Sequence, residues 1–151
     1  MQVSDLIVRA NEVETFVYPG LEGIYDSQCL VDDTSVGSTN LNLNRGVLKP
    51  GKHLEGGSHP AGYDECYYII SGRGRLALGG DPQTGEGSEV FEVEPENAVF
   101  IPGGTFHALE NPYDTDLVII TIWPRLPEPG ANGIYDARKA AWGTSFRLKS
   151  R

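Results

Sequence analysis

Short runs of apolar and β-branched residues, separated by glycine and proline, dominate the pattern of the chain. Runs of this kind predict strands at residues 65–71, 75–78, 90–93, 98–101 and 105–110. Residues 12–18 predict a further strand, and residues 38–48 alternate leucine with asparagine, which indicates one apolar and one polar face. The unbroken apolar run at residues 117–123 is typical of a strand covered on both faces. About eight short strands predict an all-β sandwich or barrel.

The pattern predicts a single domain over residues 1–151, with a barrel core at about 38–123 and N-terminal strands within 1–37. Gly72-Arg-Gly74 predicts a hairpin between the strands at 65–71 and 75–78. Residues 124–151 form a tail that carries prolines first and then a short helical turn, from an Asp136 N-cap to a stop at Gly143. We expect Trp142 to anchor this tail on the barrel or on a partner subunit.

Charge and composition restrict the partners. The net charge of −9 over 151 residues argues against nucleic acid or an anionic membrane, and favours a small-molecule substrate. The two cysteines, Cys29 and Cys66, are too few and too far apart for a disulfide framework. No apolar run reaches the ~18 residues that span a bilayer, and the N-terminus does not resemble a secretion signal. We therefore expect a cytoplasmic protein.

Two glycine-punctuated segments carry the candidate chemistry. The first, residues 51–72, places His59 and Glu65 just before an apolar strand, and the second, residues 102–111, contains His107. Each residue alone is best interpreted as an ordinary surface side chain near a turn. If Glu65 points into the barrel, however, a metal would remove the cost of burying its charge. Two imidazoles and one carboxylate are a common ligand set for a divalent metal with open coordination positions.

The first segment resembles the first sequence motif of the cupin superfamily. That motif opens with a glycine, here Gly51, and then expects a His-x-His pair, which falls at Gly57 and His59. The first imidazole is therefore missing. The glutamate of the motif corresponds to Glu65 and its closing glycine to Gly72, although the spacing from His59 to Glu65 is a residue or two longer than usual.

The second segment resembles the second cupin motif more closely. The motif expects a glycine where Glu96 stands, and its later residues are present at the expected spacing as Pro102, Gly104, His107 and Asn111. Together the two motifs cover about residues 51–111. The resemblance implies a double-stranded β-helix, a jelly-roll barrel of the cupin type.

The resemblance also implies function. Cupins hold a divalent transition metal such as iron, manganese, zinc or nickel, and here the implied ligands are His59, Glu65 and His107. The implied activity is a metal-dependent enzyme acting on a small, oxygen-rich substrate by dioxygenation or by enolisation-type isomerisation or cyclisation, with Glu65 and Tyr67 as catalytic candidates. The alternative is a metal-free or non-catalytic binder of a small, sugar-like molecule.

Two questions stay open from the sequence. By strict alternation His53 lies on the same face as Gly57 and His59, so it is a candidate for the missing imidazole, against the simpler interpretation of a solvated residue after a turn. Small cupins also pair through outer strand faces, so the resemblance and the aromatic tail around Trp142 lead us to expect a homodimer.

Overall fold

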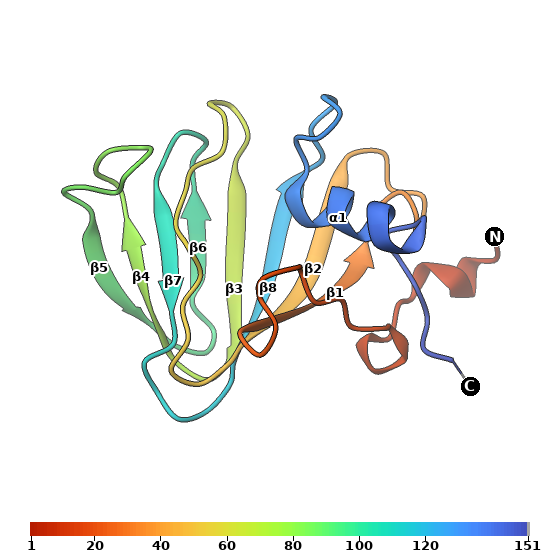
Figure 1. The fold of residues 1–151 in the computed structure, drawn as a ribbon. Coiled ribbons are helices and arrows are strands. Elements are labelled where there is room, and N and C mark those ends of the chain that lie inside the picture. The colour runs from red at the N-terminus through yellow and green to blue at the C-terminus, as the bar shows by residue number, and fades with distance from the viewer. Residues whose placement is uncertain (151) are drawn as a thin grey trace.

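The computed structural model describes residues 1–150 as two antiparallel sheets around one apolar core (Figure 1). One sheet has the strand order β1-β2-β8-β3-β6 and the other the order β5-β4-β7. The strands are Tyr25–Val31 (β1), Leu41–Leu48 (β2), Glu65–Ser71 (β3), Gly74–Leu78 (β4), Glu89–Val93 (β5), Ala98–Ile101 (β6), His107–Glu110 (β7) and Leu117–Pro124 (β8). The predicted all-β jelly-roll architecture is confirmed. Residue 151, the last of the predicted tail, lies outside the described residues.

Strand β3 shows how residue alternation builds the interior. Glu65, Tyr67 and Ile69 are buried, whereas Tyr68 and Ile70 are exposed on the outer face, as alternation predicts. Phe100 on the neighbouring β6 is 60% exposed on the same outer face. These outer apolar side chains are compatible with the expected homodimer, which stays a prediction that the mass of the particle in solution would test.

Strand β2 carries its polar face inward. Asn42 and Asn44 are 2% and 3% exposed, whereas Leu41 is 48% exposed. The alternation predicted from the sequence is therefore present, but the asparagines point into the barrel. Buried amides are costly unless they are hydrogen-bonded, so the interior on this side is built for polar contacts.

The prediction of a strand at residues 12–18 is wrong. The N-terminal region contains two short 3-10 helices, Val3–Leu6 (η1) and Ala10–Glu12 (η2), followed only by single bridges from Val13 to Leu148 and from Phe16 to Ser27. The segment divides its hydrogen bonds between β1 and the C-terminal residues, so no continuous ladder forms. Within residues 1–37, β1 is therefore the one regular strand that the described chain contains.

The prediction of a hairpin around Gly72 is also wrong, because β3 and β4 belong to different sheets. Gly72 has a positive φ of 77°, and a Cβ atom there would overlap the carbonyl oxygen of Asp116. Only glycine fits such a turn without strain. The Gly72–Gly74 turn thus carries the chain from one layer of the barrel to the other.

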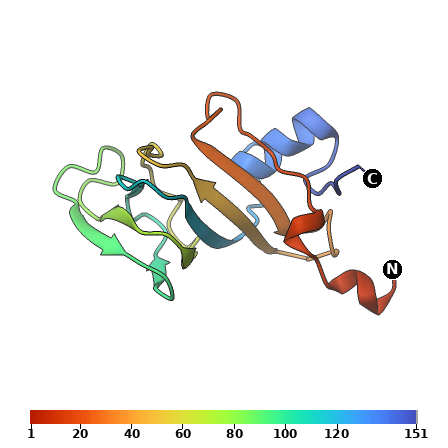
Figure 2. The same ribbon diagram turned by 90° about the horizontal axis from the view of Figure 1, so that it is seen from below.

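The tail folds back onto its own barrel. Helix α1 (Gly133–Trp142) lies beside β1, at the end of the molecule that holds both termini (Figures 1 and 2). Trp142 packs edge-to-face on Phe16 with ring centroids 5.1 Å apart, and Gly143 ends the helix in the left-handed conformation, as predicted. Asp136 is not the N-cap: it lies in the first turn, where its carboxylate accepts a hydrogen bond from the backbone of Asn132. No helix among residues 1–150 is long and apolar enough to cross a membrane.

Asp32 closes the turn after β1 and gives a pH-dependent prediction. Burial raises the pKa of this carboxyl, but hydrogen bonds from Ser145, Thr34 and the backbone of Ser35 outweigh it and hold the pKa below its ordinary value. Asp32→Asn should destabilise the protein by about 2 kcal/mol at pH 7, because charge-assisted bonds are about twice as strong as neutral ones. A lowered pKa contributes stability that is complete above about pH 4 and is lost at lower pH.

Urea unfolding of both proteins at several pH values checks this prediction. The difference between wild type and Asp32→Asn should shrink as the pH falls below about 4. The matched control is Asp33→Asn, since Asp33 is the adjacent, exposed carboxylate, which pairs with Arg125. A difference between wild type and Asp32→Asn that does not change with pH would contradict the proposed role of the Asp32 charge.

Candidate metal centre

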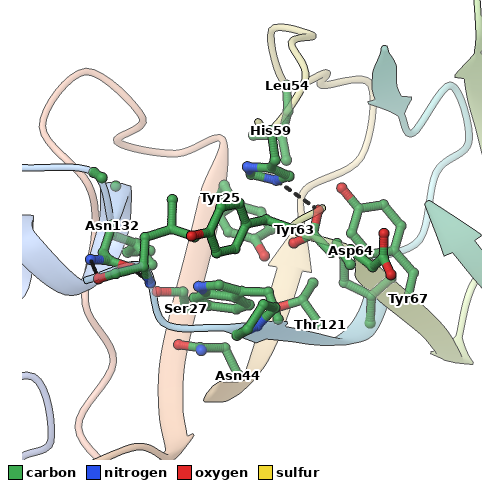
Figure 3. A pocket seen from close by; sticks show the side chains of 18 residues that line it. Tyr25, Ser27, Asn44, Leu54, His59, Tyr63, Asp64, Tyr67, Thr121 and Asn132 are labelled. Carbon is green, nitrogen blue, oxygen red and sulfur yellow. Dashed lines mark hydrogen bonds and ion pairs between the residues drawn. The ribbon is translucent and has the colours of Figure 1, made fainter. Parts of the chain in front are cut away.

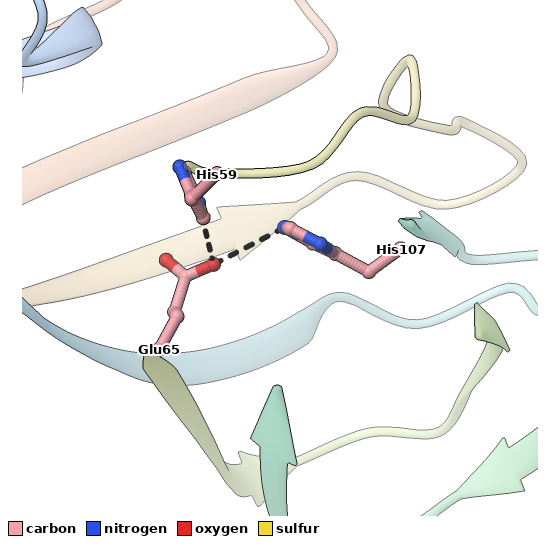
Figure 4. Close-up of side chains that lie close together, drawn as sticks. All are labelled: His59, Glu65 and His107. Carbon is pink, nitrogen blue, oxygen red and sulfur yellow. Dashed lines mark hydrogen bonds and ion pairs between the residues drawn. The ribbon is translucent and has the colours of Figure 1, made fainter. Parts of the chain in front are cut away.

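Three side chains that are far apart in the sequence converge inside the barrel (Figure 4). His59 comes from the loop before β3, Glu65 is the first residue of β3, and His107 is the first residue of β7. One carboxylate oxygen, Glu65 Oε1, lies 3.2 Å from His59 Nε2 and 3.2 Å from His107 Nε2. One donor atom from each residue lies within 4.8 Å of the other two. The structure thus brings together the three residues that the sequence predicted as ligands.

Backbone pairing fixes the loop that carries His59. Gly57 and His107 exchange two backbone hydrogen bonds, of 3.1 and 2.9 Å, and so form a directly opposed pair. Two residues further along, the carbonyl of His59 accepts a hydrogen bond of 2.7 Å from the backbone of Gly104. The loop is therefore tied to the turn and strand that present His107, so the relative position of the two imidazoles is set by main-chain bonds.

Local hydrogen bonds set the protonation of the site. Burial raises the pKa of Glu65, but the hydrogen bonds and charges of His107 and His59 outweigh it and hold the pKa below its ordinary value. His107 Nδ1 donates to the carbonyl oxygen of Thr105 at 3.1 Å, which directs Nε2 toward Glu65. Burial lowers the pKa of His107, but the bonds to Glu65 and Thr105 raise it overall. Fixing one ring nitrogen in this way is how proteins orient metal-binding histidines.

A cavity of about 220 Å³ opens from the triad toward the start of α1 (Figure 3). Aromatic side chains supply much of its wall, among them Tyr25, Tyr63, Tyr67 and Trp123. Tyr67 lies edge-on to His107, with ring centroids 6.1 Å apart, and burial followed by the charge of Glu65 raises the pKa of its phenol. The cavity therefore joins a mostly apolar chamber to two of the three convergent polar groups, His59 and Glu65, as in ligand sites generally.

A second cavity, of about 240 Å³, lies at the position of the missing imidazole. It is lined by Gly57, His59 and His107, among others, and a Cβ atom added at Gly57 would meet nothing within 4 Å. The absence of a side chain at Gly57 thus leaves open space beside the triad.

His53 does not replace the missing imidazole. It is exposed and pairs with Glu110, whereas Gly57 pairs with His107. Residues 53–57 therefore span four steps along the chain opposite only three for residues 107–110, so an extra residue interrupts the strict alternation. His53 consequently faces away from the ligand face.

The two arginines at the start of β4 form ion pairs away from the triad. Arg73 and Arg75 both pair with Glu92 on the outer surface, so they do not clamp a substrate at the triad. Sequence reasoning missed several residues that line the cavity, which come from β1, β2, β8 and the start of α1: Tyr25, Ser27, Asn44, Thr121 and Asn132. The alternation of asparagine with leucine in β2 was the one sequence pattern that could have indicated a cavity-lining residue. It does not reveal which face of the strand points inward.

Comparisons with known proteins agree with this architecture. A family model described as a cupin domain matches residues 44–123. The polyketide cyclase RemF from Streptomyces resistomycificus superposes with a TM-score of 0.64 at 20% identity, covering 81% of both chains. A predicted oxalate decarboxylase from Thermotoga maritima gives 0.61 at 20% identity, over 80% of this chain and 99% of that one. KdgF from Halomonas sp. gives 0.60 at 19% identity, over 80% and 94%.

No curated protein sequence matches the chain. The family model nevertheless covers more than half of the 151 residues, and the structural likeness extends over the same barrel. The chain belongs to the cupin family.

Proposed function

We propose that the chain is a metal-dependent enzyme that holds a divalent transition metal on His59, Glu65 and His107. The observation that supports this most strongly is the convergence of two imidazole nitrogens on one buried carboxylate oxygen. Imidazole and carboxylate ligands suit iron, manganese, nickel and zinc. The hydrogen bond from His107 to Thr105 is the kind of outer contact that keeps such a ligand in place.

The distances are compatible with such an ion. A metal with bonds of ~2.1 Å places neighbouring ligand atoms ~3.0 Å apart at right angles and ~3.4 Å apart at a tetrahedral angle. The two nitrogen–oxygen distances of 3.2 Å fall between these values. Three protein ligands leave positions for substrate, and the two adjacent cavities provide the space for it.

The proposed substrate is a small, oxygen-bearing molecule, and the proposed reaction is its enolisation-type isomerisation or cyclisation. A bound metal would supply Lewis-acid polarisation of a substrate oxygen. Glu65 Oε2 makes no hydrogen bond to either imidazole, so it is the oxygen placed to accept a substrate proton. The buried phenol of Tyr67 would donate a proton in return. Dioxygenation is the other reaction class that a two-histidine, one-carboxylate ligand set serves.

Metal analysis of the protein purified without a chelator tests the proposal. We expect about one transition-metal ion per chain in the wild type, and a metal content at least tenfold lower in His107→Ala, because losing a ligand costs more than the ~10–100-fold loss seen for outer contacts. His53→Ala is the matched control and should keep its metal. A wild-type protein without metal, or a His107→Ala variant that retains it, would contradict the proposal and favour a metal-free binding protein.

A further inference from the structure

The inner face of the five-stranded sheet carries polar groups away from the triad. Ser27 on β1, Asn44 on β2 and Thr121 on β8 line the 220 Å³ cavity and lie together below Tyr25 in Figure 3. Ser27 and Asn44 are only 2% and 3% exposed. Leaving a buried polar group without a partner costs about 1–3 kcal/mol, so these groups need a reason to be there.

Arg138 determines how Ser27 and Asn44 are oriented. This guanidinium is 1% exposed, and its Nη2 donates to Ser27 Oγ at 2.8 Å and to Asn44 Oδ1. A guanidinium can only donate, so both oxygens act as acceptors toward it. The Ser27 hydroxyl hydrogen and the Asn44 amide hydrogens must therefore point elsewhere. Neither group donates to another of residues 1–150, and both side chains line the cavity.

Tyr25 supplies a third hydrogen-bond donor at the same place. Its ring lies across Gly46 on β2, where a Cβ atom would overlap the phenol oxygen. Gly46 forms a register pair with Ser27, so the missing side chain brings the phenol over the neighbouring strand. The phenol oxygen has no hydrogen-bond partner within the described part of the chain, and Tyr25 also lines the cavity.

We propose that Tyr25, Ser27 and Asn44 bind an acceptor oxygen, a ketone carbonyl or a carboxylate, on a small and otherwise apolar molecule. Donors held in advance by the fold stabilise such an oxygen without reorganisation, and Arg138 behind them adds positive charge. The apolar body of the ligand lies against Ile119 and Trp123. The proposal deepens the proposed function by naming its substrate class, and rests on that function only for the reaction at the other end of the cavity.

The dimensions and chemistry of the cavity restrict the ligand further. A volume of about 220 Å³ lies below the ~300–1,000 Å³ of typical ligand sites, so the occupant is small. The amide group that Asn44 presents cannot accept a hydrogen bond. A hydroxyl group that accepts one of these hydrogen bonds must still place its own hydrogen on an acceptor, whereas a carbonyl or carboxylate oxygen only accepts.

Binding of three matched probes to the full chain tests the site. The protein is treated with a chelator, its fold is checked by a melting curve, and acetophenone, benzoate and ethylbenzene are titrated while 1H–15N NMR signals are recorded. Acetophenone or benzoate should bind at least about fivefold more tightly than ethylbenzene, which lacks the acceptor, and should shift the side-chain signals of Asn44 and Trp123. The stronger of the two identifies the ketone or the carboxylate. Equal binding of all three overturns the proposal.

Variants separate a binding role from a structural one. Asn44→Asp keeps the shape and the contact with Arg138 but turns a carboxylate oxygen into the cavity, so the oxygen-bearing probes should bind at least tenfold more weakly while ethylbenzene is unchanged. Tyr25→Phe should weaken them about fivefold, and Tyr68→Phe, on the outer face, should have no effect. An equal loss for ethylbenzene in both cavity variants would overturn the proposal. Because the metal has been removed, failure here is distinct from failure of the proposed metal chemistry.

Discussion

Gly57→His is expected to raise the affinity of the protein for a divalent transition metal about a hundredfold, because it adds a fourth ligand to the triad. Gly57 lies directly opposite His107 in an antiparallel pair, and opposed residues in such a pair carry their side chains on the same face. An imidazole at position 57 would therefore emerge on the side of His107. His59, two residues further on, shares that side.

The space around Gly57 accommodates the substitution. A Cβ atom there has no neighbour within 4 Å, and Gly57 does not adopt a positive φ, so a side chain causes neither overlap nor backbone strain. The adjacent cavity of about 240 Å³ has room for the ring. The same substitution closes an open coordination position, so we expect any turnover of substrate to fall while metal affinity rises.

Competition with a chromophoric chelator measures this effect. The matched control is Ser58→His, because Ser58 is exposed and its hydroxyl bonds to the carbonyl of Pro82, away from the triad. That variant should bind metal as the wild type does. If Gly57→His binds no more tightly than Ser58→His, the metal centre does not lie where the three predicted ligands converge.

Arg138→Met is expected to destabilise the protein by about 4 kcal/mol, because it removes three hydrogen bonds donated by a charged group, each worth roughly 1.5 kcal/mol or more. Arg138 joins α1 to the barrel, since it donates to Ser27 on β1, Asn44 on β2 and Ser145 in the tail. Burial lowers the pKa of its guanidinium, and the negative charge of Asp32 opposes this shift. Methionine fills much of the volume but donates no hydrogen bond, so the acceptors are left buried without a partner.

Urea and thermal unfolding measure the loss. For a chain of this length, 4 kcal/mol corresponds to a fall in Tm of roughly 10 °C. Lys139→Met is the matched control, because Lys139 is the next residue on α1 and is exposed, so its loss should change stability by less than about 1 kcal/mol. Equal effects of the two substitutions would show that the buried hydrogen bonds of Arg138 do not hold the helix to the barrel.

Much of the barrel could be predicted from the sequence because its signals are local. Alternation placed Glu65 and Tyr67 inside and Tyr68 outside, and the structure agrees. The apolar run at 117–123 became the central strand β8, which pairs with β2 on one side and β3 on the other. Gly143 ended α1 as predicted, since a left-handed residue suits glycine.

The errors arise where long-range pairing decides the outcome. Gly72 was interpreted as a hairpin turn because the adjacent strands are short and close in sequence. In the structure, however, β3 pairs with β8 and β6, and β4 pairs with β5 and β7. In β2 the period of two was correct, yet a period alone does not say which face lies inside. Asn44 points inward to Arg138 and the cavity, and the residues that form both are distant in sequence.

The convergence of His59, Glu65 and His107 was predicted, but the roles of their neighbours were not. His53 looked like a substitute for the missing imidazole only while alternation was assumed to continue to Gly57. Tyr25 gave no signal, because its phenol reaches the cavity only through the space that Gly46 leaves on the neighbouring strand. Such contacts depend on strand register, which no local pattern encodes.

The extra residue between His53 and Gly57 has an evolutionary consequence. This residue forms a bulge that divides the segment in two. The part with His53 lies on the outer face beside Glu110, and the part with Gly57 lies on the face of His107. Losing one residue there would leave three residue steps opposite three, so His53 would stay opposite Glu110 and Gly57 opposite His107 in a regular ladder. A single-codon deletion is therefore expected to remove the bulge while both faces keep their residues, so the length of this segment can change by one residue in evolution without rebuilding either sheet.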